Sequence, residues 1–235
     1  MSKENEASPD PLTASIVLGL AVGVFGISFG VLAVASGLSV AQAVAMSLLV
    51  FTGASQFAAV GVIESGGSTG AALGSALLLA ARNGAYGLAL SPTLTGRLPF
   101  RLLASHLVID ESTAMSTAQV DLASRRRGFW AAGISVFVFW NLGTLVGALG
   151  GDAIGDPERF GLDAAFPAGF VALVVPHLES IDGRLAALMG TVIALVLVPV
   201  APAGVPVLAA AAAVLIGLRN PPSSAGSSVA TEVAT

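Results

Sequence analysis

The sequence predicts an all-α fold, a polytopic membrane helix bundle of about seven or eight transmembrane segments, some of them short or broken by proline. Of the 235 residues, 55% are hydrophobic and only 10% are charged, whereas soluble domains carry about 25% charged residues. The apolar runs are continuous rather than alternating, which favours helices, because only helices or closed barrels satisfy backbone groups inside lipid. Such a chain needs the bilayer as its solvent.

Four apolar runs are long enough for a spanning helix, which needs roughly 20 residues. They lie at residues 13–36, 40–63, 69–94 and 129–150. Shorter apolar runs follow at residues 164–178, 185–200 and 205–218. Glycine, proline or charged residues separate these shorter runs, which predicts tilted half-spans or a tight helical hairpin.

The two ends of the chain differ from this apolar middle. Residues 1–12 form a polar, acidic tail without the basic segment of a secretory signal. Residues 220–235 are rich in proline, serine and alanine, which predicts a disordered tail. We therefore expect a single transmembrane domain at 13–219, in a multi-pass protein of the cell membrane.

Residues 102–120 allow two interpretations. Their polar side chains recur at spacings of three and four, on one face of a helix. These are His106, Asp110, Thr113 and Thr117. The helix either spans with this face inward or lies along the interface. With the arginines at 125–127 in the cytoplasm, a span puts both termini in the cytoplasm, and an interfacial helix puts only the C-terminus there.

Glycines recur on single helix faces. They are Gly19, Gly23, Gly26 and Gly30 in the first run, and the pairs Gly70–Gly74 and Gly143–Gly147. Small residues four apart let helix backbones approach closely. We expect these glycines to pack helices within the chain or between subunits, and the alternative is that they line a path.

A charge interrupts the third run. Arg82 lies near its middle, where a charged side chain costs about 2.5–3.5 kcal/mol on insertion scales. Asp110 and Glu111 are the carboxylates best placed to compensate it. The resulting pair either only locks the bundle or takes part in substrate-carboxylate binding or proton coupling.

Uncharged polar residues mark the second run. Thr52, Ser55 and Gln56 share a helix face beside Gly53, an arrangement suited to hydrogen bonding a small zwitterion. Interhelical hydrogen bonds, worth about 0.6 kcal/mol each, are the alternative. Further candidates are Asn83 and Tyr86, which follow Arg82, and Asn141, which is expected to face inward.

Several chemistries are excluded. The chain has no cysteine and two histidines far apart in sequence, so we expect no metal site. It has no phosphate-binding loop or hydrolase elbow, and we expect no cofactor. Without a basic stripe, nucleic acid is not an expected partner. Energy for any transport must come from an ion gradient or another subunit.

Taken in order, these motifs resemble the AzlC family of branched-chain amino acid permeases, which includes the YgaZ-type exporters. The resemblance covers roughly residues 16–200. It rests on Gly53-Ala54-Ser55-Gln56-Phe57, Arg82-Asn83, Tyr86, Asp110-Glu111, Gly143-Thr144 with Gly147, and Asp163 with Phe166. Asn83 departs from relatives that have histidine after the arginine, which affects proton coupling or substrate choice.

The resemblance implies a secondary transporter that exports branched-chain or similar apolar amino acids with a small AzlD-like membrane subunit. It implies that Thr52, Ser55 and Gln56 hold the zwitterion and that Arg82 takes the carboxylate or pairs with acids. One alternative is a structural or assembly subunit whose partner forms the path. Another is an intramembrane enzyme using His106, Asp110 and Glu111.

Overall fold

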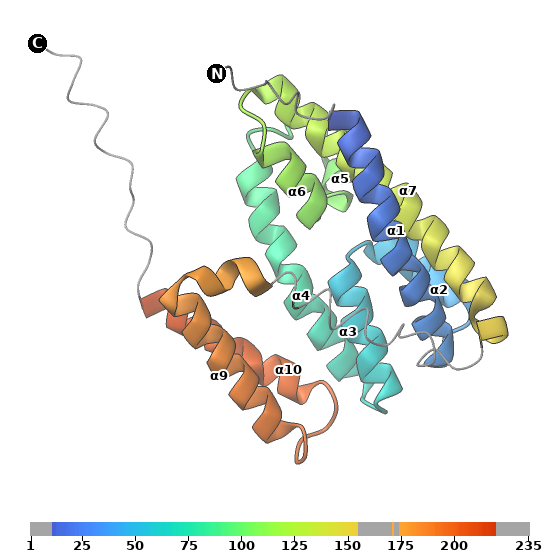
Figure 1. Cartoon of the computed structure of the whole chain (residues 1–235), viewed down its shortest axis with the longest axis vertical. Coiled ribbons are helices and arrows are strands. Elements are labelled where there is room, and N and C mark those ends of the chain that lie inside the picture. Colours follow the sequence, from blue (N-terminus) through green and yellow to red (C-terminus); the bar gives the residue numbers. More distant parts are fainter. Residues whose placement is uncertain (1–10, 155–170, 172–173, 220–235) are drawn as a thin grey trace, which may run out of the picture. The chain divides into compact units, whose positions relative to one another are not determined.

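The computed structural model describes residues 11–154, 171 and 174–219, and every regular element in those residues is a helix. The chain divides into two compact units, Met1–Val171 and Ala172–Thr235 (Figure 1). In the described residues, the helices at Leu12–Ala35 and Leu122–Gly151 are long and apolar enough to cross a membrane. The count of seven or eight spans stays a prediction.

Two long helices of the first unit, α1 (Pro11–Ala35) and α7 (Leu122–Ile154), pack closely along their length (Figure 1). Gly19 faces Ser135 and Gly30 faces Ala148. The partner on α7 rises in number with the residue on α1, so the two helices are parallel. The expectation that the glycines of the first run pack helices within the chain is confirmed for this pair.

The second apolar run, predicted as one helix over 40–63, is two helices, and that prediction was wrong. α2 (Val40–Val50) ends where Phe51 takes a left-handed conformation with φ 32° and ψ 52°. Thr52 is then extended, and α3 (Gly53–Glu64) begins. A left-handed residue with a side chain costs about 1–2 kcal/mol, and burial of the Phe51 ring, 3% exposed, offsets it.

These two helices form a hairpin rather than a bent span. Ser47 bonds Thr144, and Phe51 packs on Phe137, so α2 runs antiparallel to α7. The side chain of Gln56 reaches back across the break to the backbone oxygen of Met46, which a continuous helix would not allow. α3 therefore folds back beside α2. The chain leaves this hairpin at the same end of the unit at which α2 begins.

α4 (Thr69–Leu90) follows as an unbroken helix that packs beside α3 (Figure 1). The Ser68 hydroxyl caps its first turn by accepting from the Ala71 amide. Beyond its last turn, the Thr93 carbonyl accepts from Arg126 Nε near the start of α7, at 2.7 Å. α4 therefore runs antiparallel to α7.

Residues 102–120 are also a hairpin, neither a span nor one interfacial helix. α5 (Leu98–His106) runs parallel to α7, because Phe100 packs on Trp130 and His106 on Phe137. α6 (Asp110–Thr117) then returns, since Met115 lies against Gly128.

The expected polar face does not exist as one helical stripe, because the chain reverses at residues 107–109. Ile109 is extended, and the Ser112 hydroxyl donates to the Leu107 carbonyl and accepts from the Ile109 amide. These local bonds satisfy backbone groups that a continuous helix would have paired.

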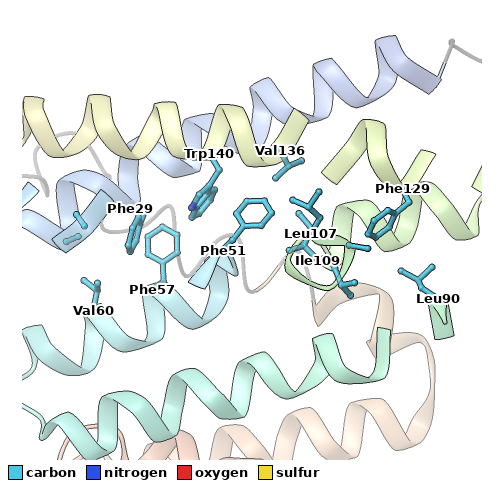
Figure 2. Close-up of a cluster of buried hydrophobic side chains, with 14 of the residues drawn as sticks. Phe29, Phe51, Phe57, Val60, Leu90, Leu107, Ile109, Phe129, Val136 and Trp140 are labelled. Atoms are coloured by element: carbon cyan, nitrogen blue, oxygen red, sulfur yellow. The ribbon is translucent and has the colours of Figure 1, made fainter. Parts of the chain in front are cut away.

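The two hairpins enter from opposite ends of the unit, and each precedes a long helix, α4 or α7. Each arm has 8 to 12 residues, or roughly 12–18 Å, about half a bilayer core. Their tips meet beside α7, where Phe51, Leu107 and Ile109 join the buried core shown in Figure 2. The arrangement is an inverted repeat about the middle of the unit.

One end of this unit collects positive charge. α5 and α7 begin there, with exposed Arg97 and Arg101 on or beside α5 and three arginines in the first turns of α7. Arg126 binds the loop between α4 and α5 through Thr93 and Thr95. α1 starts at this same end, because it is parallel to α7.

The second unit is smaller and entirely helical where described. Its elements are η2 (Val175–Glu179), α9 (Ile181–Leu197), α10 (Val205–Ala210) and η3 (Ala211–Arg219). α9 covers most of the predicted run 185–200 and packs on α10 and η3. Most of the run 164–178 and both predicted tails, apart from the start of α1, lie outside the described residues. A single domain over 13–219 stays a prediction.

Candidate functional site

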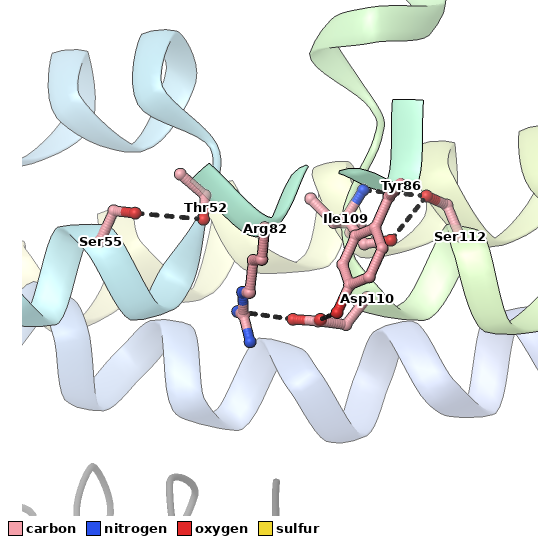
Figure 3. A network of polar contacts seen from close by, with 7 residues as sticks. All are labelled: Thr52, Ser55, Arg82, Tyr86, Ile109, Asp110 and Ser112. Atoms are coloured by element: carbon pink, nitrogen blue, oxygen red, sulfur yellow. Dashed lines mark hydrogen bonds and ion pairs between the residues drawn. The ribbon is translucent and has the colours of Figure 1, made fainter. Parts of the chain in front are cut away.

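An ion pair lies beside the tip of the second hairpin. Arg82 Nη2, in the middle of α4, is 2.6 Å from Asp110 Oδ2, on the first residue of α6 (Figure 3). The side chains are 31% and 26% exposed, so neither is sealed in the core. Of the two carboxylates predicted to compensate the charge of Arg82, Asp110 is the one that pairs with it.

A third side chain completes this polar centre. The Tyr86 hydroxyl, one helical turn after Arg82, donates to Asp110 Oδ1 at 2.7 Å (Figure 3). Both carboxylate oxygens of Asp110 are thus engaged by α4. A charge-assisted pair supported by a second donor holds the carboxylate in one orientation.

Two neighbouring candidates stay outside this polar centre. Glu111 follows Asp110 on α6 but makes no ion pair in the described part of the chain. Asn83 Oδ1 is buried without a hydrogen-bond partner among these same residues. Both lie one residue from the Arg82–Asp110 pair in sequence, and their proposed roles stay predictions.

The tip of the first hairpin presents the start of α3. Thr52 and Ser55 are buried, with hydroxyl oxygens 3.5 Å apart. No side chain caps the first amides of α3, and the helix carries no acid in its first turn. A helix N-terminus with open amides favours an anion.

Two amide side chains, Gln56 of α3 and Asn141 of α7, donate to backbone carbonyls. Gln56 is fully buried, and its Nε2 donates to the Met46 carbonyl at 3.0 Å. Asn141 Nδ2 donates to the Phe137 carbonyl of its own helix at 2.7 Å. Among the described residues the oxygens of both amides lack partners, which leaves two buried acceptors.

The structure thus divides the nine predicted site residues into groups. Arg82, Tyr86 and Asp110 are bonded together, and Thr52 contacts Ser55. Gln56 donates instead to the Met46 carbonyl of α2, and its proposed role beside Thr52 and Ser55 stays a prediction. No group of three or more histidine or acidic residues is placed for a metal in the described ranges.

Sequence reasoning missed two contributors. His106 bonds the Leu48 carbonyl of the first hairpin at 2.9 Å, and Trp140 packs against Gly53 and stacks with Phe29. The breaks carried a signal that could have located the hairpin tips. Thr52 before Gly53 has the pattern of a helix start inside an apolar run.

Two comparisons with known proteins found matches to this chain. The family model described as AzlC protein matches residues 17–154, more than half of the chain and the segment that contains both hairpins. A Helicobacter pylori (strain ATCC 700392 / 26695) protein described as an uncharacterized membrane protein is 28% identical over 191 residues, which cover 79% of this chain and 81% of that protein. No solved structure matches the chain. The chain belongs to the AzlC family of membrane proteins.

Proposed function

We propose that the chain is a secondary transporter of the cell membrane that exports branched-chain or similar apolar amino acids. The observation that carries the proposal is the meeting of two broken-helix hairpins, from opposite ends, beside the Arg82–Asp110 pair. Inverted repeats and discontinuous helices at the membrane midplane are how many secondary transporters form their substrate site.

The charges around the hairpin tips complement a zwitterion. The guanidinium of Arg82 and the open amides at the start of α3 suit the carboxylate of an amino acid. The carboxylate of Glu111 suits its ammonium group. The apolar side chain needs no polar partner.

A proton or another cation supplies the energy in this proposal. Protonation of Asp110 removes the charge that holds the guanidinium of Arg82. The arginine is then free to take the substrate carboxylate. Arg82 thus exchanges the Asp110 carboxylate for the substrate carboxylate, and this exchange couples substrate binding to the ion gradient. A small AzlD-like membrane subunit completes the transporter.

The arginine-rich end of the first unit faces the cytoplasm in this proposal. Positively charged segments beside membrane helices stay preferentially on that side. Because α1 and α7 start at this end, the N-terminus is cytoplasmic as well. A cysteine introduced at Leu122, which is 49% exposed, is expected to resist a membrane-impermeant maleimide in whole cells. Labelling from outside would reverse the orientation.

Efflux tests the proposed function directly. Cells loaded with a leucine-containing dipeptide are expected to export leucine faster when they express the chain with an AzlD-like subunit than when they express the subunit alone. The measurement is external leucine over time. Rates equal to that of cells that express neither protein would exclude leucine export. A raised rate that is the same with the subunit alone would assign the path to the partner.

Gln56→Ala is expected to reduce export by roughly tenfold, because it removes a buried donor to the Met46 carbonyl of α2. Gln119→Ala is the matched control, since no hydrogen bond of its side chain holds two elements together in the described residues. Both variants are compared at equal membrane abundance. Normal export by Gln56→Ala would remove this residue from the site.

A further inference from the structure

The two hairpins are joined at their tips by a polar contact. His106 is the last residue of α5, and its Nε2 lies 2.9 Å from the carbonyl oxygen of Leu48 in the last turn of α2. Because a carbonyl oxygen only accepts, Nε2 carries the hydrogen in this contact. Both the Nε2–H neutral ring and the imidazolium can make this bond.

The break in the first hairpin explains why this carbonyl needs a donor from elsewhere. In a continuous helix the Leu48 oxygen would accept from the amide of residue 52. The left-handed Phe51 and extended Thr52 remove that amide from the helix. The carbonyls of a helix C-terminus are partly negative, and a histidine ring is a favoured partner there.

Aromatic packing fixes the ring in place. The ring of His106 lies 5.8 Å from that of Phe51 and 5.7 Å from that of Phe137, and Phe51 and Phe137 are themselves 4.9 Å apart. The one left-handed residue with a side chain in the described part of the chain thus sits inside this contact. Strained residues of this kind persist where surrounding structure holds them and mark sites that change conformation.

We propose that the contact between His106 and the Leu48 carbonyl is a latch. It holds the tips of the two inverted hairpins together and controls when the tips separate. This proposal rests on the proposed transport function. Parting the tips leaves this carbonyl without its donor, which is unfavourable in the apolar interior of a membrane until another donor arrives. Water or the ammonium group of an amino acid has the chemistry to replace the ring.

The latch makes His106 a positioning residue rather than a substrate ligand. It holds the end of α5 against α2, and α6 with Asp110 continues from that same tip. Release of the latch therefore frees the segment that carries the partner of Arg82. Movement of the tips and opening of the ion pair become parts of one conformational change.

The test measures the separation of the tips without measuring transport. The chain has no cysteine, so Leu49→Cys and Ser105→Cys introduce two unique attachment points, both exposed. Spin labels on these cysteines report the distance between the hairpins in the full chain reconstituted in lipid. The parent protein is expected to give one short-distance population.

His106→Phe keeps an aromatic ring between Phe51 and Phe137 but removes the donor. We expect a second, longer-distance population, with the ratio of parted to joined tips raised roughly fivefold to tenfold, as the loss of one hydrogen bond predicts. His106→Gln keeps an N–H donor at similar reach and is expected to restore the short distance.

The outcomes separate the latch from the proposed function. An unchanged distance in His106→Phe, or a longer distance in both variants, would overturn the latch. Absence of leucine export by the parent would overturn the transport proposal and leave these distances unaffected. Addition of leucine to the parent is expected to lengthen the distance, and leucine without effect would exclude the ammonium group as the releasing donor.

Discussion

Removing both charges of the Arg82–Asp110 pair is expected to restore stability but not transport. Arg82→Gln leaves the Asp110 carboxylate without its cation, and Asp110→Asn leaves the guanidinium without its anion. Each single change is expected to cost roughly 2–3 kcal/mol, below the range for fully buried pairs because these side chains are partly exposed. The double variant leaves no unpaired charge and is expected to unfold near the parent temperature.

Transport is expected to respond differently. In the proposed transporter, loss of the Arg82 charge that holds the substrate carboxylate weakens binding by roughly 2–5 kcal/mol, so both variants that lack Arg82 should export at least about thirtyfold more slowly. Asp110→Asn is expected to export more slowly as well, because it cannot take up the proton that couples export to the gradient. A pair that only locks the bundle makes the opposite prediction, since the double variant would then export normally. Arg101→Gln, an exposed arginine on α5, is the control for the loss of a positive charge.

Gly147→Ala is expected to destabilise the first unit strongly. A methyl group there would lie 2.8 Å from the carbonyl carbon of Ile27 and 3.0 Å from its Cα. These are backbone atoms of a helix packed along its whole length, so the helices must separate to admit the methyl group. Overpacking of this kind costs about 1–3 kcal/mol, which corresponds to roughly 2–12 °C in melting temperature.

The same helix offers a matched control. Gly150 is three residues further along α7, and a methyl group there would meet nothing within 4 Å. Gly150→Ala is expected to leave the melting temperature unchanged or raise it slightly, because alanine favours helix by about 1 kcal/mol over glycine. Equal stability of the two variants in detergent would show that α1 and α7 are not held by close backbone contact.

The unbroken helices of the first unit could be predicted because continuous apolar length is a direct consequence of the bilayer. The hairpins could not be predicted from apolar length, because Phe51 is as apolar as its neighbours. Its side chain also gives no indication that its backbone is left-handed. The signal lay in capping residues instead. Thr52 precedes a glycine, and Ser112 follows Ile109 by three positions, as side chains near a helix start do.

The candidate site also has contacts that could be predicted from the sequence and contacts that could not. The partner of Arg82 could be anticipated because an intramembrane charge requires compensation, and Asp110 was one of two acids available. The partner of Gln56 could not, because it is a backbone oxygen of Met46 that becomes a neighbour only through the hairpin. The contact of His106 with Leu48 depends on both hairpins at once, and no spacing along the chain encodes it.

Binding of labelled leucine to the purified chain, together with the proposed AzlD-like subunit, tests most directly whether the meeting point of the hairpins holds substrate. We expect saturable binding by the parent and by Arg101→Gln, and its loss in the Arg82→Gln, Asp110→Asn double variant with an unchanged melting temperature. Undiminished binding by that folded double variant would place the substrate elsewhere in the protein and contradict a substrate site at the hairpin tips.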